Sequence, residues 1–119
     1  MIRVSRIDFD EGAGVNASEL SLLHSSLPAE QVREGSPTAS AAALGEFAGR
    51  EVGVWEITPG TVTDVEADEL FVVLSGAATV LFVDEDRLEH LRHGSVMQLK
   101  AGQRTVWTVT ETLRKVYFT

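Results

Sequence analysis

Carboxylates, the side chains best suited to bind a metal ion or to carry a proton, crowd together in the stretch from Val52 to Gly76. They stand between Gly60, which closes a Pro-Gly pair, and a hydrophobic segment that ends at Gly76. The stretch contains no histidine, and a first-row transition-metal site normally takes three or four nitrogen, oxygen or sulfur donors. Charges clustered in loops are usually solvated, so a simpler interpretation is that these carboxylates lie in a solvent-exposed turn. The four carboxylates are Asp64, Glu66, Asp68 and Glu69.

The remaining nitrogen and sulfur donors do not complete a metal site. His90 and His93 lie on a segment that we expect to be extended, where a spacing of three places them on opposite sides. His24 lies in the N-terminal region. We expect all three imidazoles to face solvent. The absence of cysteine excludes disulfides, thiol nucleophiles and thiolate metal sites, and no nucleophile elbow, phosphate loop or dinucleotide-binding glycine motif occurs.

The composition is typical of one compact acidic domain. The chain has 119 residues, of which 44% are hydrophobic, and a formal net charge of −8, which suits a single domain with a real core. This charge disfavours nucleic acid and anionic membrane surfaces as partners. No apolar run reaches the roughly 18 residues of a membrane span, and the start, MIRVSRIDFDEG, has no apolar signal-peptide segment. We therefore expect a cytoplasmic protein.

The second part of the chain, residues 50–119, alternates short hydrophobic runs with turn residues, which predicts β-strands. One run is closed by Gly76, and the last two runs flank Glu111, where we expect a compact hairpin. Short strands joined by polar turns predict an antiparallel sandwich or barrel. The runs are residues 51–58, 69–75, 77–83, 87–94, 95–102, 105–110 and 113–119.

The first part of the chain, residues 1–49, is richer in alanine and serine and has a weaker pattern. Leu20, Leu23 and Leu27 have helical spacing after Asn16, a possible N-cap, and this predicts a helix. Residues 38–47, TASAAALGEF, also have the propensity of a short helix.

The run that begins at Glu69 is apolar on both faces. Glu69, Phe71 and Val73 share one side, while the opposite side is also hydrophobic. A simple barrel needs an apolar surface only inside, so the outer face must also be covered. Either a second copy of the chain or the first fifty residues can cover it. The outer side chains are Leu70, Val72 and Leu74.

Several short motifs together resemble one family of small cupins. The markers are Pro37 after Gly35-Ser36, Gly53-Val54-Trp55-Glu56, Pro59-Gly60, Glu69 with Gly76 seven residues on, Ala101-Gly102, Trp107 and Arg114-Lys115-Val116-Tyr117. The family is that of the single-domain cupins related to the cupin domain of ureidoglycine aminohydrolase, and the resemblance covers roughly residues 27–119. It implies an all-β fold, the double-stranded β-helix or jelly-roll barrel, after an N-terminal arm over residues 1–26. It also implies that TASAAAL is a strand rather than a helix, and that the chain forms a homodimer.

The resemblance allows the metal ligands of cupins to be sought residue by residue. Gly60 and Gly76 stand at the two ends of the stretch that resembles the first cupin motif, G-x5-H-x-H-x3–4-E-x6-G, and Glu69 matches its glutamate. The two histidine positions are counted back from Glu69. Neither spacing places an imidazole at the two histidine positions. These positions fall on Val62 and Asp64, or on Thr63 and Val65.

The second cupin motif, G-x5-P-x-G-x2-H-x3-N, has also lost its ligands. Lys100 replaces the proline, Thr105 the histidine and Val109 the asparagine. Glu69 with Asp64 and the Thr105 hydroxyl would form a weak set of hard oxygens, which suits Mg²⁺ or Ca²⁺. We therefore expect no cofactor and no tightly bound transition metal, although a weakly held divalent metal stays open.

An inward Glu69 needs a partner, because a carboxylate in the barrel loses hydration. Candidate partners and pocket residues are Arg104, Thr105, Lys115 and Tyr117, with Phe71 and Asp64 nearby. Glu69 has either a structural role or a functional one that includes acid–base catalysis. Trp55 and Trp107 are either core residues or a flat wall for a ligand. Lys115 and Tyr117 share a strand face that binds a carboxylate or phosphate, or else forms a hydrated rim.

The main hypothesis from the sequence is a metal-independent cupin that binds a small polar metabolite in the barrel. One alternative is an enzyme of the ureidoglycine aminohydrolase type, which uses Glu69 with a weakly held divalent metal. Another alternative is a non-catalytic dimeric interaction module. Whether the protein is an enzyme stays open at this point, since fold does not determine function.

Overall fold

The computed structural model describes residues 2–3 and 9–119, and the regular structure of these residues is β apart from two short 3₁₀ turns. The predicted all-β class is confirmed. No helix in the described residues is long and apolar enough to cross a membrane. The strands are β1 (Ile2–Arg3), β2 (Ser25–Ser26), β3 (Val32–Glu34), β4 (Thr38–Phe47), β5 (Arg50–Ile57), β6 (Gly60–Val65), β7 (Glu69–Phe82), β8 (Arg87–Leu91), β9 (Val96–Leu99) and β10 (Arg104–Phe118); the turns are η1 (Phe9–Glu11) and η2 (Ala29–Gln31).

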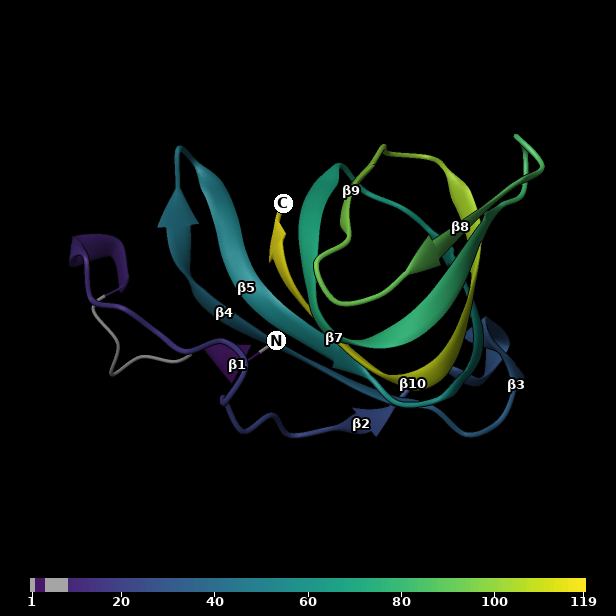
Figure 1. Cartoon of the computed structure of the whole chain (residues 1–119), viewed down its shortest axis with the longest axis horizontal. Helices are drawn as coiled ribbons and strands as arrows, with labels where there is room; N and C mark the ends of the chain where they lie inside the picture. The colour runs from purple at the N-terminus through teal and green to yellow at the C-terminus, as the bar shows by residue number, and fades with distance from the viewer. Residues whose placement is uncertain (1, 4–8) are drawn as a thin grey trace.

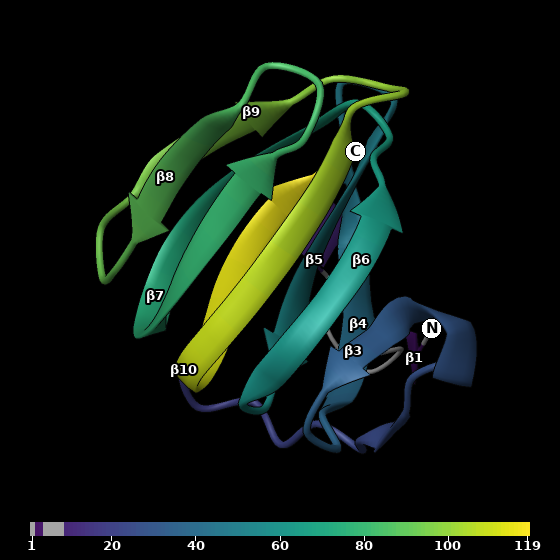
Figure 2. The ribbon, with the colours of Figure 1, turned by 90° about the vertical axis from the view of Figure 1, so that its right-hand side faces the viewer.

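Strand β10 is the element around which the sheet closes. Its N-terminal half pairs with β6 and β7, and its C-terminal half pairs with β5 and β7. β4 extends the sheet beyond β5, while β8 and β9 both pair with β7. The sheet curls so that β7, β8, β9 and β10 surround a common interior, and β4 and β5 reach out beyond it (Figure 1). Figure 2 shows β7, β10 and β6 side by side as long, tilted strands.

Two predicted strand ends are wrong, because the chain bulges there instead of turning. Gly76 does not end a strand, since β7 runs through it from Glu69 to Phe82. Glu111 does not lie in a hairpin, since β10 continues past it and stays paired with β7. The pairing register shifts on both sides of Glu111, which marks a β-bulge. A bulge bends a strand without ending it, so both strands wrap around the core.

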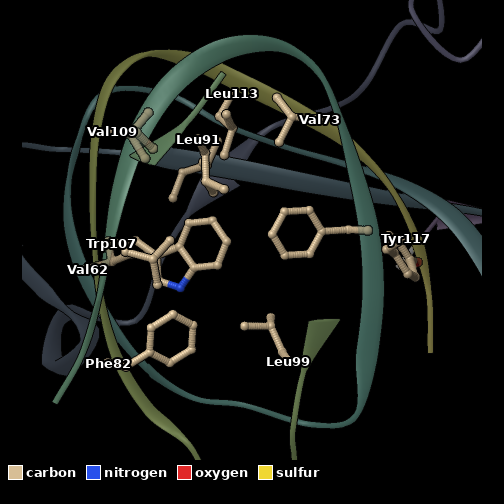
Figure 3. Packing of buried hydrophobic residues seen from close by; sticks show 13 residues of the cluster. Val62, Val73, Phe82, Leu91, Leu99, Trp107, Val109, Leu113 and Tyr117 are labelled. Carbon is tan, nitrogen blue, oxygen red and sulfur yellow. The ribbon is translucent and has the colours of Figure 1, made fainter. Parts of the chain in front are cut away.

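The alternation of inward and outward side chains in β7 changes phase at this bend. Phe71 and Val73 are buried before Gly76, and Val80 and Phe82 are buried after it. Gly76 has a φ of +95°, a conformation that side chains with a Cβ rarely adopt. The bend therefore keeps both halves of β7 directed at the same core. Figure 3 shows this core, whose buried residues also include Leu91, Leu99, Trp107, Val109 and Leu113.

The alanine-rich segment is a strand, as the resemblance implies and against its own helix propensity. β4 pairs along its length with β5, where Ala41 lies opposite Trp55 and Ala43 lies opposite Gly53. Pairing in the sheet outweighs a propensity difference of a few tenths of a kcal/mol per residue. The small Ala41 side chain leaves space beside the Trp55 ring.

The predicted helix after Asn16 is absent, and that segment contains a short turn. The Oδ1 atom of Asn16 accepts a hydrogen bond of 3.0 Å from the Ser18 N–H, an Asx-type turn. Leu27 packs against the core cluster, whereas Leu23 is 79% exposed. The leucines therefore do not form one buried stripe, and their helical spacing was misleading.

The expectation for the histidines is right for two of them and wrong for His24. His90 and His93 are exposed. His24 is partly buried on the outer face of the sheet, with Nε2 2.7 Å from Glu56 Oε1 and Nδ1 3.0 Å from Thr38 Oγ1. The packing of the N-terminal segment against β4 and β5 buries it.

Glu56 and Arg114 hold that segment to the barrel. Arg114 Nε donates to Glu56 Oε2 over 2.7 Å, and Arg114 Nη1 donates to the Ala17 carbonyl over 2.9 Å. Burial acts to raise the pKa of Glu56, but the hydrogen bonds from Arg114 and His24 outweigh it and lower that pKa below its ordinary value. The folded state therefore favours the ionised Glu56.

The outer face of β7 and β9 keeps exposed hydrophobic side chains. Leu70 is 44% exposed and Val96 is 65% exposed. Val96 pairs with Val72, next to the pair of Leu70 and Gln98. The described part of the first fifty residues does not cover this patch fully. The homodimer stays a prediction, which light scattering at micromolar concentration can test.

The bend in β7 predicts a strong effect of Gly76→Ala. A Cβ at this position would overlap the carbonyl group of Thr112 and the Cα of Leu113, and it would also require an unfavourable φ. Gly102→Ala is the matched control, because Gly102 has a similar φ of +89° but nothing within 4 Å of a Cβ. We expect Gly76→Ala to lower the free energy of unfolding by about 2 kcal/mol more than Gly102→Ala. Urea unfolding measures both, and equal losses would contradict the proposed role of the bend.

The lowered pKa of Glu56 predicts a loss of stability in acid. A carboxyl with a depressed folded-state pKa contributes stability that is present above its unfolded pKa and is lost as pH falls through its folded pKa. Below about pH 5, the unfolding free energy of the wild type should therefore fall more steeply than that of Glu56→Gln. Denaturant unfolding at a series of pH values checks this difference. Parallel pH profiles would show that Glu56 is not held ionised by its partners.

Candidate functional site

A cavity of about 300 Å³ opens on the inner side of the curled sheet. Strands β4, β5, β6, β7 and β10 contribute to its wall, together with Leu27 and Gln31 from the segment before β3. This volume is at the lower end for ligand pockets and suits a small metabolite. The aromatic and ionisable lining residues are Glu51, Trp55, Asp64, Glu66, Glu69, Trp107, Lys115 and Tyr117.

The Lys115 ammonium group is buried among three aromatic rings and one carboxylate. Its Nζ atom donates to Glu69 Oε2 over 2.6 Å. The same atom lies 4.3 Å, 4.6 Å and 5.0 Å from the ring centroids of Phe71, Trp55 and Trp107. A buried ammonium needs such a partner and such ring faces in place of water. The predicted alternative of a hydrated rim at Lys115 and Tyr117 is wrong, because both residues are buried.

Strand register places these groups together. Lys115 lies directly opposite Trp55 on β5, and Tyr117 lies opposite Phe71 on β7. Residues opposite each other in neighbouring strands point to the same face of the sheet. The Trp55 and Trp107 rings meet edge to face, with centroids 6.0 Å apart. The inner face of β10 therefore brings Lys115 into the aromatic cluster.

Glu66 is held by two neutral donors. Its Oε2 atom accepts a hydrogen bond of 2.5 Å from the Thr105 hydroxyl and one of 3.0 Å from Trp107 Nε1. Thr105 and Trp107 point inward on β10, two residues apart, and are buried. Both donors are fixed by packing, so the Glu66 carboxylate has a defined orientation beside the cavity.

Glu51 and Tyr117 form a second pair at the cavity wall. The Tyr117 hydroxyl donates to Glu51 Oε2 over 2.9 Å. Burial, followed by this hydrogen bond, raises the pKa of Tyr117 well above its ordinary value. Gly53 makes room for the phenol, since a Cβ there would overlap the Tyr117 hydroxyl. Tyr117 therefore acts as a neutral donor.

Asp64 lies closer to solvent, on β6 opposite Thr105. Partial burial, and then the negative charges of Glu66 and Glu69, raise its pKa. Its Oδ1 atom accepts a hydrogen bond of 2.8 Å from the Val65 N–H, which acts in the opposite direction. Burial is the largest cause of the pKa shift, and the neighbouring carboxylates add to it.

The residues at the cupin metal positions do not fit a metal ion. Glu69 is already bound to an ammonium group, Val62 and Val109 are core side chains, and the Thr105 hydroxyl donates to Glu66. In residues 2–3 and 9–119, no group of three or more His, Cys, Asp or Glu side chains is arranged to hold a metal. A cation beside Glu69 would have to displace the Lys115 ammonium.

The structure brings most of the predicted pocket residues together. Thr105 and Phe71 lie directly behind the wall, where they contact Glu66 and Lys115. Arg104 is the exception and does not line the cavity, because alternation turns it to the outer face, where it pairs with Asp84. Six predicted residues line the cavity: Trp55, Asp64, Glu69, Trp107, Lys115 and Tyr117.

Two carboxylates of the cavity, Glu51 and Glu66, were missing from the predicted site. Glu51 shares a strand face with Gly53 and Trp55, so alternation along β5 was a usable signal. Glu66 follows the end of β6 in a turn, where no periodicity indicates the direction of a side chain. Its role depends on Trp107 and Thr105, which are about forty residues further along the chain.

Comparisons with solved structures support the cupin jelly roll. The chain is similar to the EutQ protein of Clostridium difficile (18% identity, TM-score 0.58, over 69% of this chain and 61% of that one). It is also similar to a putative ethanolamine utilization protein Q of Salmonella typhimurium LT2 (18% identity, TM-score 0.58, over 68% of this chain and 68% of that one). A third similar structure is a Pseudomonas syringae protein of unknown function from the DUF861 family (21% identity, TM-score 0.73). The match covers 90% of this chain and 48% of that one.

These similarities, all below one quarter identity, establish the fold alone. The chain spans about three fifths of the Clostridium protein and about half of the Pseudomonas protein. Among curated proteins, no sequence matches. The EutQ-like cupin domain matches residues 44–117, from within β4 to Tyr117 in β10. Since this match covers more than half of the chain, the protein belongs to the EutQ-like cupin family.

Proposed function

We propose that this protein is a metal-independent cupin that binds a small polar metabolite in the cavity of its barrel. The observation that carries the proposal is the contact of 2.6 Å between Lys115 Nζ and Glu69 Oε2. It puts a side-chain ammonium on the carboxylate that matches the metal-binding glutamate of cupins. The positive charge that a metal would bring is thus supplied by the chain itself.

The wall of the cavity supports binding of a molecule with both polar and flat apolar parts. Trp55 and Trp107 offer ring surface, and Ile57 and Val62 add aliphatic surface. Glu51 and Glu66 are oriented by fixed donors, so they can accept hydrogen bonds from a ligand without first reorganising. A few oriented polar groups in an otherwise apolar wall are typical of small-molecule sites.

A catalytic role of Glu69 and the relation to ureidoglycine aminohydrolase stay predictions. Glu69 shares a short hydrogen bond with Lys115, so a proton could pass between the two groups. The geometry supports binding more directly than it supports a particular reaction. The cytoplasmic location and the homodimer are likewise carried as expectations.

The proposal predicts ligand binding in the presence of a chelator. In a thermal-shift screen of small metabolites with EDTA, a binding compound should raise the melting temperature of the wild type by about 5 °C. Ala41→Phe should abolish the shift, because the added ring would fill the cavity beside Trp55. Ala101→Phe adds the same ring in an exposed turn and should leave the shift intact.

Metal analysis of untagged, dialysed protein complements the screen. The expected result is no stoichiometric Mn, Fe, Ni or Zn. One equivalent of such a metal per chain would contradict metal independence, and ligand shifts that survive Ala41→Phe would contradict the location of the site.

The buried pair predicts strong coupling between Lys115 and Glu69. Lys115→Met keeps the aromatic packing but leaves Glu69 without its cation, and should lower the free energy of unfolding by about 3 kcal/mol. Lys115→Met combined with Glu69→Gln should cost about 1–3 kcal/mol less than the sum of the single changes. Urea unfolding of the four proteins measures this coupling. Additive losses would show that the two groups do not form a pair in solution.

A further inference from the structure

The cavity has a strongly unequal charge distribution. Four of its lining side chains are acidic and one is basic, so the wall carries three more acidic than basic groups. The acidic residues come from β5, β6, β7 and the turn after β6, and they converge on one half-open cavity. Charges in such a space are screened less than charges on a surface.

The single cation of the wall is largely shielded from a ligand. The Lys115 side chain is only 7% exposed, and Glu69 and three aromatic rings surround its ammonium group. An anionic ligand would therefore have to displace Glu69 before it could contact Lys115. The pair with Glu69 also neutralises that one positive charge within the wall.

The other carboxylates are bound by neutral groups. Glu66 accepts from a hydroxyl and an indole N–H, and Glu51 accepts from a phenol. Within the part of the chain that the structure describes, neither Glu51 nor Glu66 forms an ion pair. Neutral donors orient these carboxylates but leave their negative charge uncompensated.

The aromatic wall is itself suited to a cation. The faces of Trp55, Phe71 and Trp107 already surround one ammonium group within the cavity wall. Trp55 is only partly buried and lines the cavity, so part of its ring surface can also contact a ligand. Tryptophan is the most favourable aromatic side chain for contact with an organic cation.

We infer that the ligand is a small organic cation, an inference that rests on the proposed function. Its charged head is a flat amidinium-like or guanidinium-like group or a primary ammonium group. Its N–H groups donate to Glu66 and Asp64, and its apolar body packs against Trp55. A hydrogen bond from a cation to an oriented carboxylate is stronger than one between neutral groups. Neutral and anionic molecules of the same shape bind more weakly.

Benzamidine, benzamide and sodium benzoate test this inference. The three probes share a flat ring and a trigonal head group, and near neutral pH they are cationic, neutral and anionic. Isothermal titration calorimetry at one pH and one salt concentration compares their affinities for the full chain. We expect benzamidinium to bind the wild type at least about tenfold more tightly than either other probe.

Two variants with the same change of charge locate the effect. Glu66→Gln retains an oxygen that accepts from Thr105 and Trp107, so the fold is preserved, and benzamidinium affinity should fall about tenfold. Glu111→Gln removes a charge at the exposed bulge of β10, outside the cavity, and should leave the affinity unchanged. Equal losses in both variants would overturn the inference, because they would indicate general attraction to an acidic protein.

Other outcomes separate this inference from the proposed function. If benzamide or benzoate binds as tightly as benzamidinium, the inference that the ligand carries a positive charge is overturned. Displacement of benzamidinium by millimolar Ca²⁺ with the same dependence on Glu66 would replace the organic cation with a metal ion. Absence of binding by all three probes, with a metabolite shift that Ala41→Phe abolishes, would overturn the inference and retain the binding function. If no metabolite shift occurs either, both proposals fail.

Discussion

An ammonium group that leaves water loses hydration worth several kcal/mol, and the barrel is built around one such group, that of Lys115. The Glu69 carboxylate at 2.6 Å and the ring faces of Phe71, Trp55 and Trp107 replace its water. These residues come from β5, β7 and β10, so the pair can exist only when the sheet has closed. It also occupies the carboxylate that a metal-binding cupin would use.

The remaining carboxylates of the cavity follow a different rule. Glu66 and Glu51 are oriented by hydroxyl, indole and phenol groups, which donate hydrogen bonds without bringing charge. The pKa of Asp64 is raised first by partial burial, and the neighbouring carboxylates add to this effect. The cavity thus combines one ammonium group, paired with Glu69, and carboxylates that have no cationic partner among the described residues. This combination distinguishes it from a hydrophobic pocket and from a metal centre.

The two faces of β10 have separate tasks. Lys115 points inward to the cavity, while the preceding residue, Arg114, points outward and binds Glu56 and the Ala17 carbonyl. Alternation in a strand makes this separation automatic, because neighbouring side chains point to opposite faces. The N-terminal segment is therefore attached through the outer face without disturbing the inner one. The bulges near Glu111 and the bend at Gly76 bend the two longest strands around the core.

Much of the molecule could be predicted from local pattern. Alternation along residues 69–73 predicted the side on which Glu69 lies. The cupin motifs showed that metal ligands are replaced at Val62, Thr105 and Val109. Turn residues separated most strands. Trp55 and Trp107 were recognised as candidate walls, although alternation alone could not decide which face of their strands was inner. Local pattern carries this information because strand periodicity is a property of neighbouring residues.

What the sequence alone determined is the all-β class, the loss of the cupin metal ligands and most of the aromatic and ionisable residues of the cavity wall. Only the tertiary structure decided that Lys115 rather than Arg104 pairs with Glu69, that Glu66 joins the site, and that His24 binds Glu56. It also decided that Gly76 and Glu111 lie within continuous strands. The reason is physical: each of these outcomes depends on register and burial between segments that are distant in the chain, and no local pattern records them.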